Sequence, residues 1–252
     1  MDTDTYSGAD VVAAQARDFV PVRLNHWAVR DLGRRLGVNG TPVTVFLDGD
    51  EPVMRVRSYR GTADWLVELR RALDARATMR SIRERLTKSP DDPAILLEEV
   101  ERLWEFDLVA AARDRAEKLF AKGVAGAGVV LLDILAHDDS EAVPNGNALL
   151  QLAMKVGELD PKGEYGTADD VAAFEALAWH VLRDPAQARD AAKRALEKHA
   201  GSPRADMMHY VLGMSEHASG RADDAVKSLR EAARSAGRYG AKAREALEAL
   251  RR

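Results

Sequence analysis

The chain has 252 residues, of which 46% are hydrophobic and 31% charged, and this composition excludes a disordered protein. It contains no cysteine, which excludes disulfide bonds, thiolate metal sites and cysteine nucleophiles. The net charge of −4 leaves no basic surplus for nucleic acid or an anionic membrane, and no apolar run reaches the ~20 residues of a membrane span. The acidic start Met1–Tyr6 does not match a secretory signal, so we expect a cytoplasmic protein.

The first 77 residues alternate helical and strand patterns. The run Phe19–Leu24 is β-branched and aromatic, and its proline suggests a strand at a sheet edge. The run Val43–Leu47 is apolar on both faces and predicts a buried strand, whereas Val53–Arg57 alternates and predicts one wet face. In chain order the predicted elements are a helix at 9–17, a strand at 19–24, a helix at 27–36, strands at 43–47 and 53–57 joined by a hairpin loop at 48–51, and a helix at 63–76.

This order resembles the latter two thirds of a thioredoxin-like domain. The resemblance is carried by Phe19-Val20-Pro21-Val22-Arg23-Leu24, by Leu36-Gly37-Val38-Asn39-Gly40-Thr41-Pro42-Val43-Thr44-Val45-Phe46-Leu47-Asp48, and by Tyr59-Arg60-Gly61. It implies that Pro42 is a cis-proline and that Thr41 and Pro42 contact extended polypeptide through the backbone. A cis-proline that only shapes the turn before a strand is the alternative, and we favour it because the redox cysteines are missing.

The chain departs from that family at its redox motif. Cys-x-x-Cys is absent, and so is the central strand that precedes it in the family. Without that strand, facing rows of backbone N–H and C=O groups would be left unpaired. Three explanations stay open: the flanking strands pair directly, another chain supplies a strand, or the natural protein begins upstream of Met1.

From residue 78 onward the hydrophobic periodicity is helical, with prolines between the periodic stretches. We therefore expect an all-α domain over 78–252, following the thioredoxin-like domain over 1–77. The expected helices span 78–87, 93–104, 107–121, 126–136, 146–157, 168–182, 186–199, 204–218, 222–235 and 238–251.

The stretch 204–237 resembles a tetratricopeptide (TPR) repeat. It carries Leu212-Gly213, then Gly220, Ala225 and Ala232, which are small residues at the spacing where paired helices cross. Ala188 precedes Ala225 by 37 residues, close to the ~34-residue period of such repeats. The preceding unit and the stretch 93–121 look like degenerate copies, and 241–252 would be a polar terminal helix.

The predicted sites are binding sites. A concave face built from the first helix of each pair would present Trp179, Met208, His209 and Glu216 to a polypeptide. None of the six histidines forms an i, i+4 pair, so we expect no metal site, and we find no catalytic constellation and no cofactor motif. The loop 160–170 lacks the required glycine and glutamate of a calcium-binding EF-hand.

These patterns predict a bacterial, co-chaperone-like interaction protein with a redox-inactive thioredoxin-like domain and a TPR-like peptide-binding solenoid. The partner would be a protein or peptide, with a homo-oligomer or a strand-donating partner also open. The alternative is a thiol–disulfide oxidoreductase whose catalytic segment lies upstream of Met1.

Overall fold

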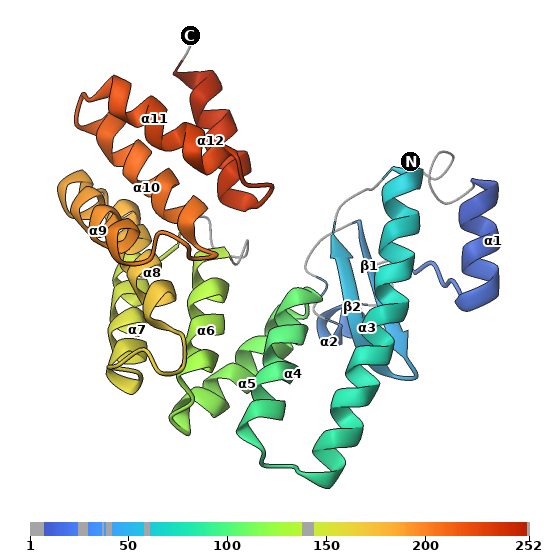
Figure 1. Ribbon diagram of the computed structural model, residues 1–252. Coiled ribbons are helices and arrows are strands. Elements are labelled where there is room, and N and C mark those ends of the chain that lie inside the picture. Colours follow the sequence, from blue (N-terminus) through green and yellow to red (C-terminus); the bar gives the residue numbers. More distant parts are fainter. Residues whose placement is uncertain are drawn as a thin grey trace. The chain divides into compact units, whose positions relative to one another are not determined.

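The computed structural model describes residues 8–24, 30–36, 38, 42–57, 61–137 and 144–250 (Figure 1). The chain divides into two compact units, Met1–Arg115 and Ala116–Arg252. Composition places a domain boundary at residue 77, and that boundary stays a prediction. Residue 77 itself lies inside a continuous helix.

The first unit contains helices around a small β-hairpin. Its elements are α1 (Ala9–Asp18), α2 (Arg30–Arg35), β1 (Val43–Asp48), β2 (Glu51–Arg57), α3 (Thr62–Lys88) and α4 (Pro93–Glu105), followed by α5 (Val109–Ala121), which runs across the division. The stretch Thr62–Lys88 has no glycine or proline, and α3 therefore continues through the residues where two helices were expected.

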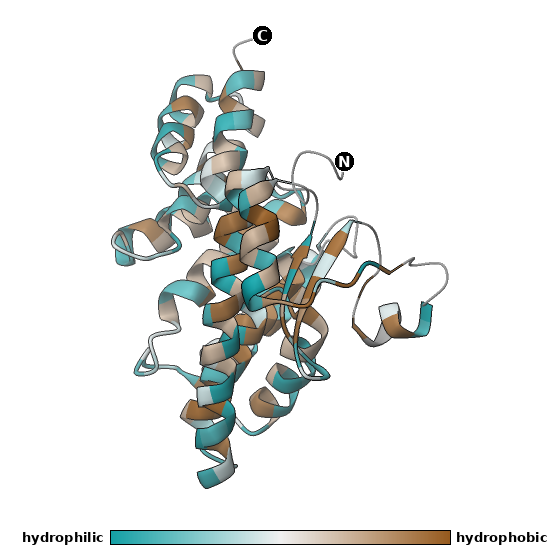
Figure 2. Cartoon of the chain, turned by 90° about the vertical axis from the view of Figure 1, so that its right-hand side faces the viewer, coloured by the Kyte–Doolittle hydropathy of each residue, from teal (hydrophilic) through white to brown (hydrophobic). Residues whose placement is uncertain are grey.

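The hairpin confirms the predicted strands and turn. β1 pairs with β2 in antiparallel register, with Val45 opposite Arg55 and Phe46 opposite Met54, and the ladder shifts between Phe46 and Leu47. Gly49 at the turn has φ +64°, a conformation that glycine adopts without steric cost. Figure 2 shows apolar residues in brown beside polar ones in teal along both strands.

The core of this unit forms between the hairpin and α3, which packs against β2, α1 and α4. The ring of Phe46 lies 5.5 Å from that of Phe19 and 6.0 Å from that of Trp65, between centroids. Two ion pairs hold β2 on the side away from β1. Arg55 Nε and Arg57 Nε both donate to Asp107 Oδ2 at 2.8 Å. These contacts join β2 to the turn between α4 and α5.

Two strand predictions in this unit are wrong. Phe19–Leu24 is not a strand, and within it Val20 is 89% and Val22 72% exposed. The reason is that strand formation needs a partner, and none of the described residues forms a ladder with this segment. β1 is also less buried than predicted, since only Phe46 is buried and Leu47 is 47% exposed. Among the described residues the sheet has two strands, so the thioredoxin-like fold is not shown.

The second unit is helical and confirms the predicted helices to within about two residues at each end. Its helices after α5 are α6 (Ala125–His137), α7 (Gly146–Leu159), α8 (Ala168–Val181), α9 (Pro185–Lys198), α10 (Ala205–Ala218), α11 (Ala222–Ala233) and α12 (Arg238–Ala249). Capping explains several starts: the side chain of Asn145 accepts from the N–H of Ala148, and that of Asp184 from the N–H of Gln187.

Four helix connections use the same turn. In each, the residue after the helix cap is left-handed, and the next N–H bonds to a carbonyl five residues back, which is the Schellman motif. The left-handed residues are Asp107, Gly123, Arg183 and Gly220. The bonds run from Leu108 to Leu103, Val124 to Leu119, Asp184 to Trp179 and Arg221 to Glu216. This shared turn relates α4–α5 to the pairs α8–α9 and α10–α11.

Candidate functional site: the inner face of the helical array

The contacts in the second unit alternate in a way that defines two faces. From α6 to α12, each helix packs against the next one in the sequence, and in addition α6 contacts α8, α8 contacts α10 and α10 contacts α12. Among the described residues, α7, α9 and α11 show no comparable contacts with one another. The even-numbered helices are therefore closer together, and we call their shared surface the inner face.

Small residues set the close crossing of α10 and α11. A Cβ added at Gly213 would lie 2.7 Å from Leu229 Cγ and 3.0 Å from the carbonyl oxygen of Ala225. Gly213, Ala225 and Ala232 are buried, as the TPR-like spacing predicts. Ala176 stands 37 residues before Gly213 and is fully buried in α8, so the preceding pair repeats the pattern.

A ladder of rings connects the inner helices. It runs from His137 on α6 to Tyr239 on α12 at 5.7 Å, then to Tyr210 on α10 at 5.6 Å, then to His180 on α8 at 5.9 Å, between ring centroids. The ammonium group of Lys242 lies 5.4 Å from the centroid of Tyr239. Aromatic contacts at these distances are favourable, and the ladder therefore fixes the spacing of four helices.

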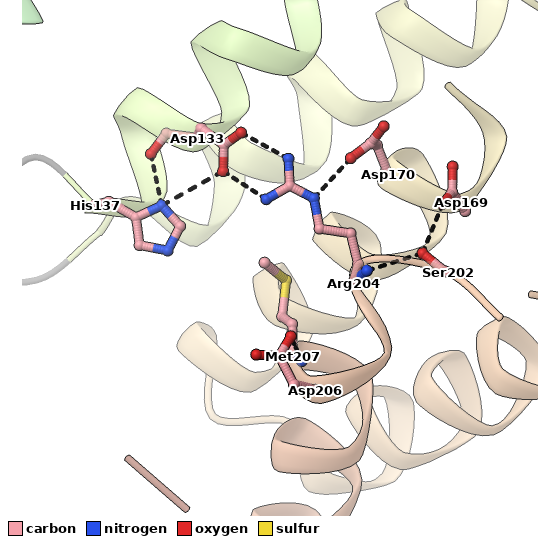
Figure 3. A network of polar contacts seen from close by, with 8 residues as sticks. All are labelled: Asp133, His137, Asp169, Asp170, Ser202, Arg204, Asp206 and Met207. Carbon is pink, nitrogen blue, oxygen red and sulfur yellow. Dashed lines mark hydrogen bonds and ion pairs between the residues drawn. The ribbon is translucent and has the colours of Figure 1, made fainter. Parts of the chain in front are cut away.

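Beside the ladder, Arg204 occupies the centre of an ionic network (Figure 3). Its guanidinium binds Asp133 of α6 through both carboxylate oxygens, at 2.8 and 2.6 Å, and its Nε donates to Asp170 of α8 at 2.7 Å. The same group lies 5.1 Å from the ring centroid of Phe174. Because Arg204 immediately precedes α10, a single side chain connects three inner helices.

Burial and charge together shift the titration of these groups. Burial lowers the pKa of His137, with Arg238 and Arg204 adding to the effect and Asp133 opposing it. Burial, with Lys242, also lowers the pKa of His180. The pKa of the Tyr239 hydroxyl is raised by burial, which favours its neutral form. These shifts all favour the neutral form of the ring concerned.

Burial opposes ionisation in the network itself. The pKa of the Asp170 carboxyl is raised by burial, although Arg204 acts to lower it. The pKa of Arg204 is raised by the two carboxylates against the effect of its own burial. The guanidinium is therefore held in its charged form, and each carboxylate depends on it for charge compensation.

Helical geometry separates the four predicted contact residues of this unit. Met208 is fully buried, and Glu216 is 4% exposed and accepts a 2.8 Å hydrogen bond from Ser228 of α11. Both side chains are enclosed by the helical pairs. Trp179 packs half-buried against the core. His209 is half-buried, and Glu231 of α11 is the charged group that acts on its pKa, which burial lowers.

The residues of the inner face are the sequence neighbours of two predicted ones. His180 follows Trp179 and Tyr210 follows His209, and the second of each pair contacts the other inner helices. A step of one residue turns a helix by about 100°, so neighbouring residues of a helix lie on different faces. The contacts with His180 and Tyr239 place Tyr210 between α8 and α12, whereas Gly213, one turn later, packs against α11.

The remaining predicted contacts belong to the first unit. Pro42 is exposed in the bend that leads into β1, and Thr41 lies outside the described residues. The described residues contain no group of three metal-ligating side chains of the His, Cys, Asp or Glu type. No described helix is both long enough and apolar enough to cross a membrane.

One of three comparisons with known proteins supports the helical architecture. No family model matches the chain, and no curated protein matches its sequence. Among solved structures, a thermophilic TPR protein of Thermus thermophilus superimposes with a TM-score of 0.51 at 17% sequence identity. The match covers 73% of this chain and 93% of that one. The chain thus has a mostly helical, TPR-like fold.

Proposed function

We propose that this chain is a protein–protein interaction module that binds an extended polypeptide along the inner face of the second unit. The observation that carries the proposal is the ring ladder, in which His180 and Tyr210 are partly exposed while their neighbours fix them in position. A rigid, amphipathic ring gives contact area at little cost in conformational entropy. The TPR-like fold supports the same role, since stacked helix pairs create extended binding surfaces.

The finer parts of the proposal concern the first unit and the cellular location and role of the chain. We propose a cytoplasmic, co-chaperone-like role in which the first unit is a redox-inactive relative of thioredoxin, with Thr41 and Pro42 as further polypeptide contacts. The hairpin after Pro42 and the absence of cysteine support this assignment. Trp179 and His209 enter the proposal as contacts that flank His180 and Tyr210.

The proposal is tested by selecting linear peptides from a random phage-displayed library against the full chain. The affinity of a synthetic copy of a selected peptide is then measured for the variants Tyr210→Ala and His180→Ala. We expect each variant to lower the affinity by about tenfold, because an aromatic anchor contributes over about 1 kcal/mol.

The matched control is Lys227→Ala, which truncates an exposed side chain on the outer helix α11. Its affinity should equal that of the unaltered chain. Circular dichroism establishes that all three variants are folded. If Lys227→Ala lowers the affinity as much as Tyr210→Ala, or if no peptide is selected, the inner face is not the binding surface.

A further inference from the structure

The two outer edges of the β-hairpin differ in whether their backbone N–H and C=O groups form hydrogen bonds. The N–H of Arg55 on β2 donates to the carbonyl oxygen of Phe106 at 2.9 Å, so the turn between α4 and α5 covers the outer edge of β2. Arg55 is opposite Val45 in the ladder. In an antiparallel pair, opposed residues either bond to each other or both point outward. The N–H and C=O groups of Val45 therefore point away from β2.

The outer edge of β1 has no partner strand among the described residues. The backbone groups of Val43 point the same way as those of Val45, because the direction alternates along a strand. Within the described part of the chain, no residue forms a backbone hydrogen bond with Val43 or Val45 on that side. Both side chains are half-buried, and Leu47 is 47% exposed. Such an edge is a template for an additional strand.

The same chain carries a segment with the chemistry of that missing strand. In Phe19–Leu24 every second residue is apolar and exposed: Val20 by 89%, Val22 by 72% and Leu24 by 51%. In an extended chain these three side chains share one face, and their backbone groups share one edge. Pro21 has no N–H and stands on the opposite edge, so it impairs that edge alone.

We propose that Val20–Leu24 of a second copy of this chain adds as a strand to the outer edge of β1, giving a homodimer by reciprocal exchange. Pairing through the edge that lacks Pro21 places two of the residues Val20, Val22 and Leu24 directly opposite Val43 and Val45, on the same face of the sheet. Val43 and Val45 then each meet an apolar residue, and β1 gains a partner. The exchange uses the same contact twice and therefore closes at two copies.

The absence of cysteine from the sequence makes this pairing directly testable. One preparation carries a single Val45→Cys substitution and an affinity tag, and the others carry Val20→Cys, Val22→Cys or Leu24→Cys. Equimolar mixtures are oxidised mildly. Since each chain has one cysteine, a disulfide between residue 45 and the segment can form only between copies. Opposed strand residues have Cα atoms about 5.5 Å apart, which suits a disulfide.

We expect a disulfide-linked heterodimer with at least one segment variant. The control replaces Val45→Cys by Val67→Cys, which is 53% exposed on α3, and it should give at most a tenth of that product. Equal yields with both partners, or no linked product, would overturn the proposal.

Light scattering on the cysteine-free chain tests independently which edge of the segment Val20–Leu24 pairs with β1, because it measures the oligomeric state. The unaltered chain should be a dimer that dissociates on dilution. Val22→Pro removes an N–H from the pairing edge and should raise the dissociation constant at least tenfold, whereas Arg23→Pro alters the other edge and should leave the dimer in place. A monomer at every concentration, or the same loss in both variants, would refute the assignment.

Discussion

The two units differ in where their apolar side chains are buried and where they are exposed. In the second unit, buried alanines and a glycine let paired helices cross closely, and the surface that remains is organised by rings and ion pairs. In the first unit, the exposed large apolar side chains include four near or on the hairpin, Val20, Val22, Leu24 and Leu47, whereas those of the second unit are Met154, Leu159 and Tyr165, away from the inner face. The comparison teaches that the helical array buries its apolar faces pair by pair, whereas the hairpin has an edge without a partner strand among the described residues, which we propose a second copy completes.

Removing the centre of the ionic network should have the largest effect on the array. Arg204→Met leaves Asp133 and Asp170 without their charge partner in a mostly buried site, and it should lower the free energy of unfolding by about 3 kcal/mol. Urea denaturation measures this change. The control Arg194→Met removes an exposed ion pair with Glu175 and should cost less than about 0.5 kcal/mol. A comparable loss in both variants would mean that the network does not hold the inner helices.

The close crossing of α10 and α11 is tested by adding one methyl group. Gly213→Ala forces the new Cβ against Leu229 and a backbone carbonyl, so the free energy of unfolding should fall by about 2 kcal/mol. Gly157→Ala makes the same change in α7, where the Cβ meets only Val171 at 3.7 Å. That control should be stabilised by about 0.5 kcal/mol through the unfolded state. Thermal unfolding of both variants measures these changes. An unchanged free energy of unfolding in Gly213→Ala would contradict close packing at that crossing.

The shared helix turns allow a reciprocal exchange of residues. Arg183 and Gly220 occupy the same left-handed position in consecutive pairs, with φ of 60° and 74°. Arg183→Gly should raise the free energy of unfolding by about 1 kcal/mol, and Gly220→Arg should lower it by about as much, because the left-handed region is strained for any residue with a Cβ. Chemical denaturation of the two variants should therefore give shifts of opposite sign. Shifts of the same sign would show that the two turns are not equivalent.

Acid should lower the free energy of unfolding of the array through the ring ladder. This is the smallest of the four expected effects. The folded-state pKa of His180 lies below its unfolded value, so protonation favours the unfolded chain, and the stabilisation present above about pH 6.5 is lost as the pH falls. His180→Phe keeps a ring and should make the free energy of unfolding less dependent on pH between about 7.5 and 5.5. His217→Phe alters an exposed residue of α10 and serves as the control. An unchanged pH slope in His180→Phe would exclude this histidine as a contributor.

The sequence predicted the array well because its determinants are local. Asp184-Pro185 marks the start of α9 and Gly220 marks the turn before α11, and each acts within a few residues of its own position. The strand at Phe19–Leu24 could not be decided in this way, since its state depends on a distant partner. The predicted contacts Trp179 and His209 stay a prediction, and the ring contacts between helices involve their neighbours His180 and Tyr210, which periodicity alone does not single out.

The central claim is that the inner face binds polypeptide, and hydroxyl-radical footprinting with a selected peptide tests it most directly. Bound peptide should protect Tyr210 and His180 from oxidation while Met154, 60% exposed on the outer helix α7, is oxidised as before. Protection of Met154, with Tyr210 and His180 unchanged, would contradict the account.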